Sequence, residues 1–69
     1  MDNDQQAQLE AIIRREAHAL VAKNNAIPSI KQLDAAVRAA PDYDNSRDDA
    51  PGFTEARFQM MELELEALS

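Results

Sequence analysis

Residues 60–69 read MMELELEALS, and apolar and acidic side chains alternate between Met61 and Glu66. A period of two fits an edge strand, but a helix with apolar side chains on two sides gives the same pattern. The segment is rich in Leu, Met, Glu and Ala, which are strong helix formers, and the chain offers no second strand to pair with it. The stretch therefore predicts the end of a helix over 54–68, with Thr54 as its cap.

This helix would be apolar on two sides. At about 100° per residue, one stripe consists of Phe53, Ala56, Met60, Leu63 and Ala67, and the other of Phe58, Met61, Leu65 and Leu68. A short chain cannot easily cover two such stripes by itself. We therefore expect a homodimer, or a higher symmetric oligomer. Its interface would consist of Phe58, Met60, Met61, Leu63, Leu65 and Leu68.

An earlier apolar stripe predicts a long helix over about residues 4–24. Its members recur at spacings of three and four: Leu9, Ile12, Ile13, Ala17, Leu20 and Val21. Glu10 and Arg14 are spaced for an ion pair on its outer side. Asn24 and Asn25 can end the helix because asparagine tolerates the left-handed conformation.

A shorter helix over 29–40 follows. Ser29 and Gln32 form the pattern of a capping box, which marks its start. Its buried face would consist of Ile30, Leu33, Val37 and Ala40. Asp34 and Arg38 are spaced for an ion pair on its outer side. The chain is thus predicted to be all-α, a single domain over 1–69 with two long helices and a short one between them.

The composition limits how this domain is stabilised. With 69 residues and 13 alanines, its core is small, and such cores rarely supply more than roughly 3–5 kcal/mol. The chain has no cysteine and one histidine, so disulfides and thiolate or histidine metal sites are not expected. Self-association is the remaining means of stabilisation.

The net charge of −6 disfavours nucleic acid, which is bound through basic surfaces. An acidic surface suits a partner protein with a basic surface, or serves solubility alone, and both interpretations stay open. No apolar run approaches the roughly 20 residues that span a membrane, and the polar start MDNDQQ is unlike a signal peptide. We expect a cytoplasmic protein that does not bind membranes.

The segment 41–52, PDYDNSRDDAPG, is predicted to be an acidic loop. The residues proposed to bind a partner lie in this loop and on the acidic face of the last helix: Tyr43, Asp42, Asp44, Asp48, Asp49, Glu55, Glu62 and Glu66. Tyrosine is enriched at binding hot spots, which favours recognition by Tyr43. The alternative is that its ring folds back over the second helix into the core.

Part of the loop resembles a calcium-binding loop. Asp44, Ser46 and Asp48 alternate, and Glu55 stands twelfth, where an EF-hand has its bidentate glutamate. Asp49 occupies the sixth position, where the sharp turn requires glycine. We therefore expect neither a metal nor another cofactor.

Catalytic residues are not evident. His18 lies near arginines on the polar side of the first helix, where it would bind an anion, carry a proton or simply be exposed. Nothing supplies a nucleophile or a paired acid at helical spacing, and a small core has little room for a water-excluding pocket. The sequence predicts that the protein is not an enzyme.

The stretch ALVAKNNAIPSIKQLDAAVRAA, residues 19–40, resembles the first two helices of winged-helix and repressor domains, in which a Pro-Ser step begins the second helix. The resemblance implies a basic recognition helix after a short turn. The acidic loop 41–52 follows instead and would repel phosphate, so DNA binding is the less favoured interpretation.

The leading hypothesis is a small acidic protein-binding module, a homodimer that docks on a partner protein and modulates or inhibits it. Many accessory proteins of phages and mobile elements are small, acidic, helical and free of cysteine. The alternative is a structural, assembly or chaperone subunit whose helical faces serve self-assembly.

Overall fold

The computed structural model describes residues 3–48 and 50–69, and within them the chain is helical without strands. In chain order the elements are α1 (Asn3–Asn24), α2 (Ile30–Ala39), the short 3-10 helix η1 (Asn45–Arg47) and α3 (Phe53–Leu68). Each of the three α-helices packs against the other two. The predicted all-α class is confirmed.

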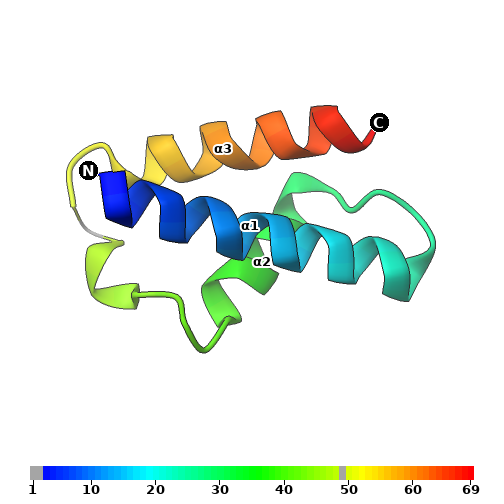
Figure 1. Cartoon of the computed structure of the whole chain (residues 1–69), viewed down its shortest axis with the longest axis horizontal. Helices are drawn as coiled ribbons and strands as arrows, with labels where there is room; N and C mark the ends of the chain where they lie inside the picture. The colour runs from blue at the N-terminus through cyan, green and yellow to red at the C-terminus, as the bar shows by residue number, and fades with distance from the viewer. Residues whose placement is uncertain (1–2, 49) are drawn as a thin grey trace.

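Helices α1 and α3 lie side by side and run in the same direction, while α2 crosses behind α1 (Figure 1). The connection from α2 to α3, which contains η1, runs along the end of the molecule where α1 begins. It returns the chain to the start of α3. The end of α3 therefore lies at the opposite end of the bundle, near the connection between α1 and α2.

The ends of the first two helices follow the sequence signals. Asn25 has a φ of 54° and ends α1 in the left-handed conformation. The capping box is confirmed, since the Ser29 hydroxyl accepts from the Gln32 amide at 3.2 Å and the Gln32 side chain accepts from the Ser29 amide at 3.0 Å. The predicted cap of α3 is wrong: Gly52, with a φ of 78°, precedes the helix, and the Thr54 hydroxyl donates to the Asp48 carbonyl oxygen.

All three helices contribute to one core. Its buried members are Leu9, Ile12, Ile13, Ala17, Leu33, Val37, Ala40, Tyr43, Phe53 and Met61. Partly buried side chains surround it, namely Leu20, Ile30, Phe58, Met60, Leu65 and Leu68. Apart from Tyr43, these residues come from the stripes that the sequence predicted for the helices.

The two apolar stripes of α3 prove to be the flanks of one broad buried face. Arg57 lies between them, Met61 belongs to the second stripe, and both are buried, with 4% and 0% of their surface exposed. Met61 is thus covered by the chain itself and has no surface to offer a second copy. Leu63 is different because 62% of its surface is exposed.

Candidate protein-binding surface

A buried arginine fastens the acidic loop to the helices. Arg57 of α3 donates from Nε to Asp34 Oδ1 of α2 at 3.0 Å. It donates from Nη1 to Asp48 Oδ1 at 3.0 Å and to the Tyr43 hydroxyl at 2.9 Å. Its guanidinium also lies over the Phe58 ring, 5.3 Å from the centroid. One cation therefore joins α2, α3 and the connection between them.

Hydrogen bonding makes this burial tolerable. The Tyr43 hydroxyl accepts from Arg57 and donates to Asp48, so it satisfies both neighbours. No buried side-chain nitrogen or oxygen in the described part of the chain lacks a partner. A fully bonded buried network fixes a single arrangement of the groups that it joins.

The titration of Tyr43 and Asp48 reflects this network. Burial raises the pKa of Tyr43 to about 12, and its hydrogen bond to the Asp48 carboxylate adds to the effect. The hydrogen bond from Tyr43 lowers the pKa of Asp48, and the charges of Arg38 and Arg57 lower it further. The neutral phenol and the charged carboxylate are thus the forms that the fold selects.

The predicted recognition residues of the loop are largely engaged within the chain. Tyr43 is 6% exposed and belongs to the core, which agrees with the second of the two interpretations of this residue. Asp48 also binds Arg38, at 3.2 Å. The predicted pair of Asp34 with Arg38 is wrong, because Arg57 takes Asp34 and Asp48 takes Arg38. Asp49 lies outside the described residues.

The two remaining loop aspartates also have donors in the chain. Asp42 accepts two hydrogen bonds from Arg15, at 2.7 and 2.8 Å, and these bonds lower the pKa of its carboxyl. Asp44 accepts from the Ser46 amide at 3.0 Å and from its hydroxyl at 2.6 Å, which caps η1. No group of acidic or histidine side chains suited to a metal ion occurs among the described residues.

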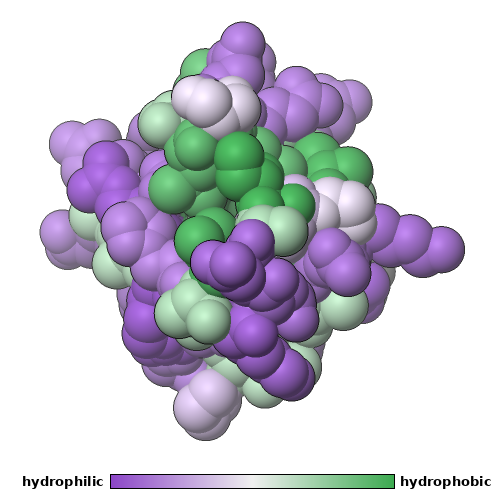
Figure 2. Space-filling view, turned by 90° about the vertical axis from the view of Figure 1, so that its right-hand side faces the viewer, coloured by the Kyte–Doolittle hydropathy of each residue, from purple (hydrophilic) through white to green (hydrophobic). Residues whose placement is uncertain are grey.

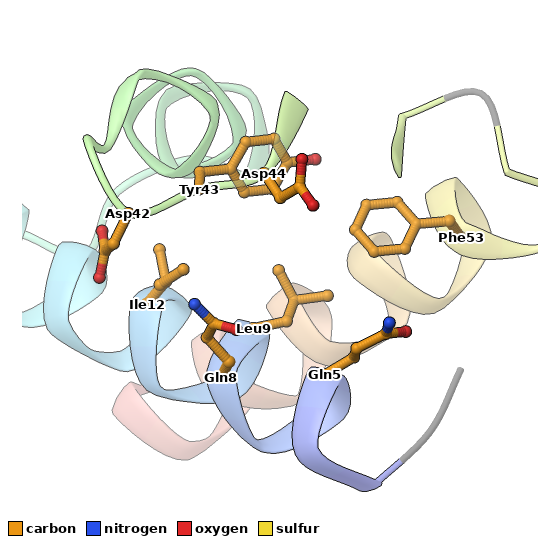
Figure 3. A pocket seen from close by; sticks show the side chains of 8 residues that line it. All are labelled: Gln5, Gln8, Leu9, Ile12, Asp42, Tyr43, Asp44 and Phe53. Atoms are coloured by element: carbon orange, nitrogen blue, oxygen red, sulfur yellow. The ribbon is translucent and has the colours of Figure 1, made fainter. Parts of the chain in front are cut away.

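A small hollow of about 140 Å³ lies between α1, this loop and the start of α3 (Figure 3). Leu9 and Ile12 face it from α1, and Phe53 closes one side. Asp42 and Asp44 lie at its loop edge. Because both carboxylates already accept hydrogen bonds within the chain, the hollow offers little unmet charge to a ligand.

The acidic face of α3 differs from the loop in this respect. Glu55, Glu62 and Glu66 are exposed, and none of the three has an ion-pair partner among the residues that the structure describes. Glu55 stands in the first turn, where a negative charge stabilises a helix. Glu62 and Glu66 stand near the other end, and we call this pair the acidic ridge.

The two glutamates of the acidic ridge destabilise α3. The last turn of α3 contains no basic residue, so Glu66 faces the negative end of the helix dipole uncompensated. Glu62 and Glu66 are also four residues apart, a spacing at which like charges repel by a few tenths of a kcal/mol. Both are exposed, so their side chains remain accessible to a partner.

An apolar groove runs beside the acidic ridge, between α3 and α1. It has a volume of about 300 Å³, and Ile13, Met60, Leu63 and Ala67 form its apolar lining. Its α1 edge carries the predicted pair of Glu10 with Arg14, which is confirmed at 2.9 Å. Glu64 lies nearby, 3.7 Å from Arg14 and 3.5 Å from His18.

Sequence reasoning missed the Arg57 network. On the helical wheel of α3, Arg57 lies between the two apolar stripes, at the centre of the buried face. A lone cation at such a position signals a buried ion pair, since an unpaired charge is too costly to bury. Two of its partners, Tyr43 and Asp48, lie in the adjacent aspartate-rich loop, and the third, Asp34, lies in α2.

Comparisons with protein-family models, curated proteins and solved structures found no match to this chain. Within the described residues, none of the helices combines the length and apolar character needed to cross a membrane. The class that the structure defines is a three-helix unit with a fastened acidic loop and one helix that exposes an apolar and acidic surface. Its function is therefore inferred from that surface.

Proposed function

We propose that this chain is a non-catalytic protein-binding module that docks α3 against a basic surface of a partner protein. The observation that carries the proposal is the acidic ridge beside Leu63. Glu62 and Glu66 lower the stability of α3. By contrast, four arginines form ion pairs within the chain: Arg14, Arg15, Arg38 and Arg57. Charges that oppose folding are the ones expected where a protein trades stability for binding.

Inhibition is the expected consequence for the partner. A protein of 69 residues covers only the surface on which it docks, and it supplies no catalytic group of its own in this proposal. A standard interface takes about 800 Å² from each partner. Set against a total accessible surface of 4628 Å², such docking would occupy α3 and its surroundings.

The test is capture of the partner from a lysate of the source organism, treated with nuclease, with bound proteins quantified by mass spectrometry. The wild type is compared with the double variant Glu62→Gln and Glu66→Gln. Glutamine keeps the length and helix propensity of glutamate, so this variant should remain folded. We expect one stoichiometric partner on the wild type and its loss on the variant.

A control of equal charge separates a local effect from net charge. Asp2→Asn with Asp4→Asn removes the same number of charges, and Asp4 stands in the first turn of α1, at the opposite end of the bundle from the end of α3. Retention of the partner by this control, together with its loss from the ridge variant, supports the proposal. Equal retention by all three proteins would refute it.

Self-association through α3 is a second candidate, and one surface favours it. Figure 2 shows an apolar patch at the end of the bundle that carries the C-terminus. Ile30 and Leu65 line a shallow hollow there together with Glu62 and Glu66 of the acidic ridge. Leu68 is partly buried, and Ile27 in the preceding connection is 46% exposed. An assembly or scaffold subunit would use such a patch to join copies of itself.

Sedimentation at micromolar concentrations tests this candidate. A homodimer that Leu65→Ser converts to a monomer would establish the interface on this patch. A monomeric mass with cooperative melting would exclude it. Growth beyond a dimer would favour an assembly role over the docking of a foreign partner.

A further inference from the structure

The groove between α1 and α3 has the form of a docking site for a helix. On α3 its seam consists of Ala56, Met60, Leu63 and Ala67, at successive spacings of four, three and four. This is the spacing with which one helix packs along another. The seam spans about 16 Å, or three helical turns.

The chain leaves this seam largely uncovered at its centre. Leu63 has 62% of its surface exposed and lines two neighbouring hollows, one of which includes Gln59 and the other Arg14. An exposed leucine that borders two hollows suits a partner surface that carries several apolar side chains. An amphipathic helix presents such a surface.

The charges around the groove favour a positively charged partner. Glu10 of α1 and Glu64 of α3 share Arg14, so this side of the groove carries a net negative charge. On the outer side, Glu66 and Glu62 lie about 60° and about 100° around the helix from Leu63. Lysine and arginine side chains in the groove are long enough to reach these two carboxylates while their aliphatic stems cover apolar surface.

These observations favour a basic partner over a second copy of this chain. Two copies would bring together surfaces with the same excess of carboxylates, and each chain carries a net charge of −6. Like charges that face each other across an interface oppose association. A positively charged helix instead pairs with the ridge and with the α1 edge.

We propose that the groove receives a basic amphipathic helix of the partner, with apolar side chains on Met60, Leu63 and Ala67 and lysines or arginines beside the acidic ridge. This inference rests on the proposed function and specifies the partner's element. It places Leu63 at the centre of the interface, where binding energy concentrates. The fastened acidic loop and its hollow lie outside this interface.

The probe is a synthetic amphipathic peptide of leucine and lysine, about 18 residues long, which is roughly 27 Å of helix. Its binding is measured by fluorescence anisotropy at protein concentrations up to about 100 µM. A second peptide has the same composition in an order that gives no apolar face. We expect the amphipathic peptide to bind at least about tenfold more tightly, which equals about 1.4 kcal/mol.

Matched variants locate the site. Leu63→Ser should weaken binding of the amphipathic peptide by about tenfold, whereas Ile27→Ser, an exposed apolar residue outside the groove, should leave it unchanged. Glu62→Gln with Glu66→Gln should weaken binding and reduce its dependence on salt. Both serine variants change exposed side chains and should melt close to the wild type.

Each contrary outcome has a distinct meaning. If both peptides bind equally and only the ridge variant weakens them, the acidic docking of the proposed function stands and the helix in the groove is refuted. If neither peptide binds, or if Leu63→Ser has no effect, the groove is likewise refuted. Self-association of the wild type that Leu63→Ser abolishes would assign the groove to a second copy and overturn the inference.

Discussion

Replacing Arg57 with methionine tests the structural account most severely, because methionine keeps most of the apolar length and removes the charge. The Asp34 and Asp48 carboxylates would lose their bonds to the guanidinium, and the Tyr43 hydroxyl would lose its donor. Hydrogen bonds to charged groups contribute about 1.5–3 kcal/mol each. The side chains of Asp34 and Asp48 are 17% and 21% exposed, so water recovers part of this loss.

The expected net loss is about 3 kcal/mol, at the lower end for removing one partner of a buried ion pair. A small domain has a total stability of roughly 5 kcal/mol, so the variant should be close to unfolding. Urea unfolding followed by helical circular dichroism measures the change. With a slope of about 1 kcal/mol per molar, the midpoint should fall by about 3 M.

Two companion variants sharpen the result. Arg57→Lys keeps the charge but loses the planar fork, so it should lie between the wild type and Arg57→Met. Adding Asp34→Asn and Asp48→Asn to Arg57→Met removes the uncompensated carboxylates and should recover part of the loss. A fall of less than about 1 kcal/mol for Arg57→Met alone would refute the network as the fastening of the loop.

Four further predictions concern the network, the start of α3 and the acidic ridge. Because the pKa of Tyr43 is raised to about 12, its contribution to the free energy of unfolding is present below about pH 10 and is lost as the pH rises through 12. Tyr43→Phe should abolish this alkaline loss of stability in thermal melts. The lowered pKa of Asp48 means that its contribution is present above about pH 4 and is lost as the pH falls further, so Asp48→Asn should flatten acid melting curves. Gly52→Ala should lose about 1 kcal/mol in urea unfolding through backbone strain alone, since φ is 78° and a Cβ would meet nothing within 4 Å. Glu62→Gln with Glu66→Gln should raise the stability by up to about 1 kcal/mol, and a gain that persists at high salt would contradict its electrostatic origin.

Local signals in the sequence predicted the helices well. The capping box at Ser29 and the asparagine end of α1 depend on side chains a few residues apart, and both signals were correct. Spacings of three and four identified the core side of each helix because the buried stripe repeats with the helical turn. The start of α3 was misplaced because glycine in the left-handed conformation, rather than a threonine cap, precedes it.

The long-range polar contacts were beyond local reasoning. Asp34 and Asp48 meet Arg57 across 23 and nine residues of chain, and their proximity depends on how α2 crosses the bundle. The ion pair of Asp34 with Arg38 was predicted from spacing alone, whereas a buried cation competes more strongly for a carboxylate than an exposed one. Tyr43 was proposed for recognition because tyrosine is enriched at binding hot spots, yet its ring packs near Phe53, with the two ring centroids 6.4 Å apart.

The surface that carries the proposed function was predicted in part. Glu55, Glu62 and Glu66 were recognised as one face, and they are exposed as a helical wheel requires. The groove beside them depends on α1, which the periodicity of α3 cannot place. The interface predicted on Phe58, Met60, Met61, Leu63, Leu65 and Leu68 stays a prediction, except that Met61 is buried within the chain.

The most direct test of the central claim is the salt dependence of the affinity between this protein and the partner captured on it. Calorimetric titrations from about 50 to about 500 mM salt would compare the wild type with the Glu62→Gln and Glu66→Gln variant. We predict that the wild type loses affinity steeply with salt, and that the variant binds weakly with a shallower dependence. Equal affinities and equal salt dependences for the two proteins would contradict the assignment of α3 as the binding surface.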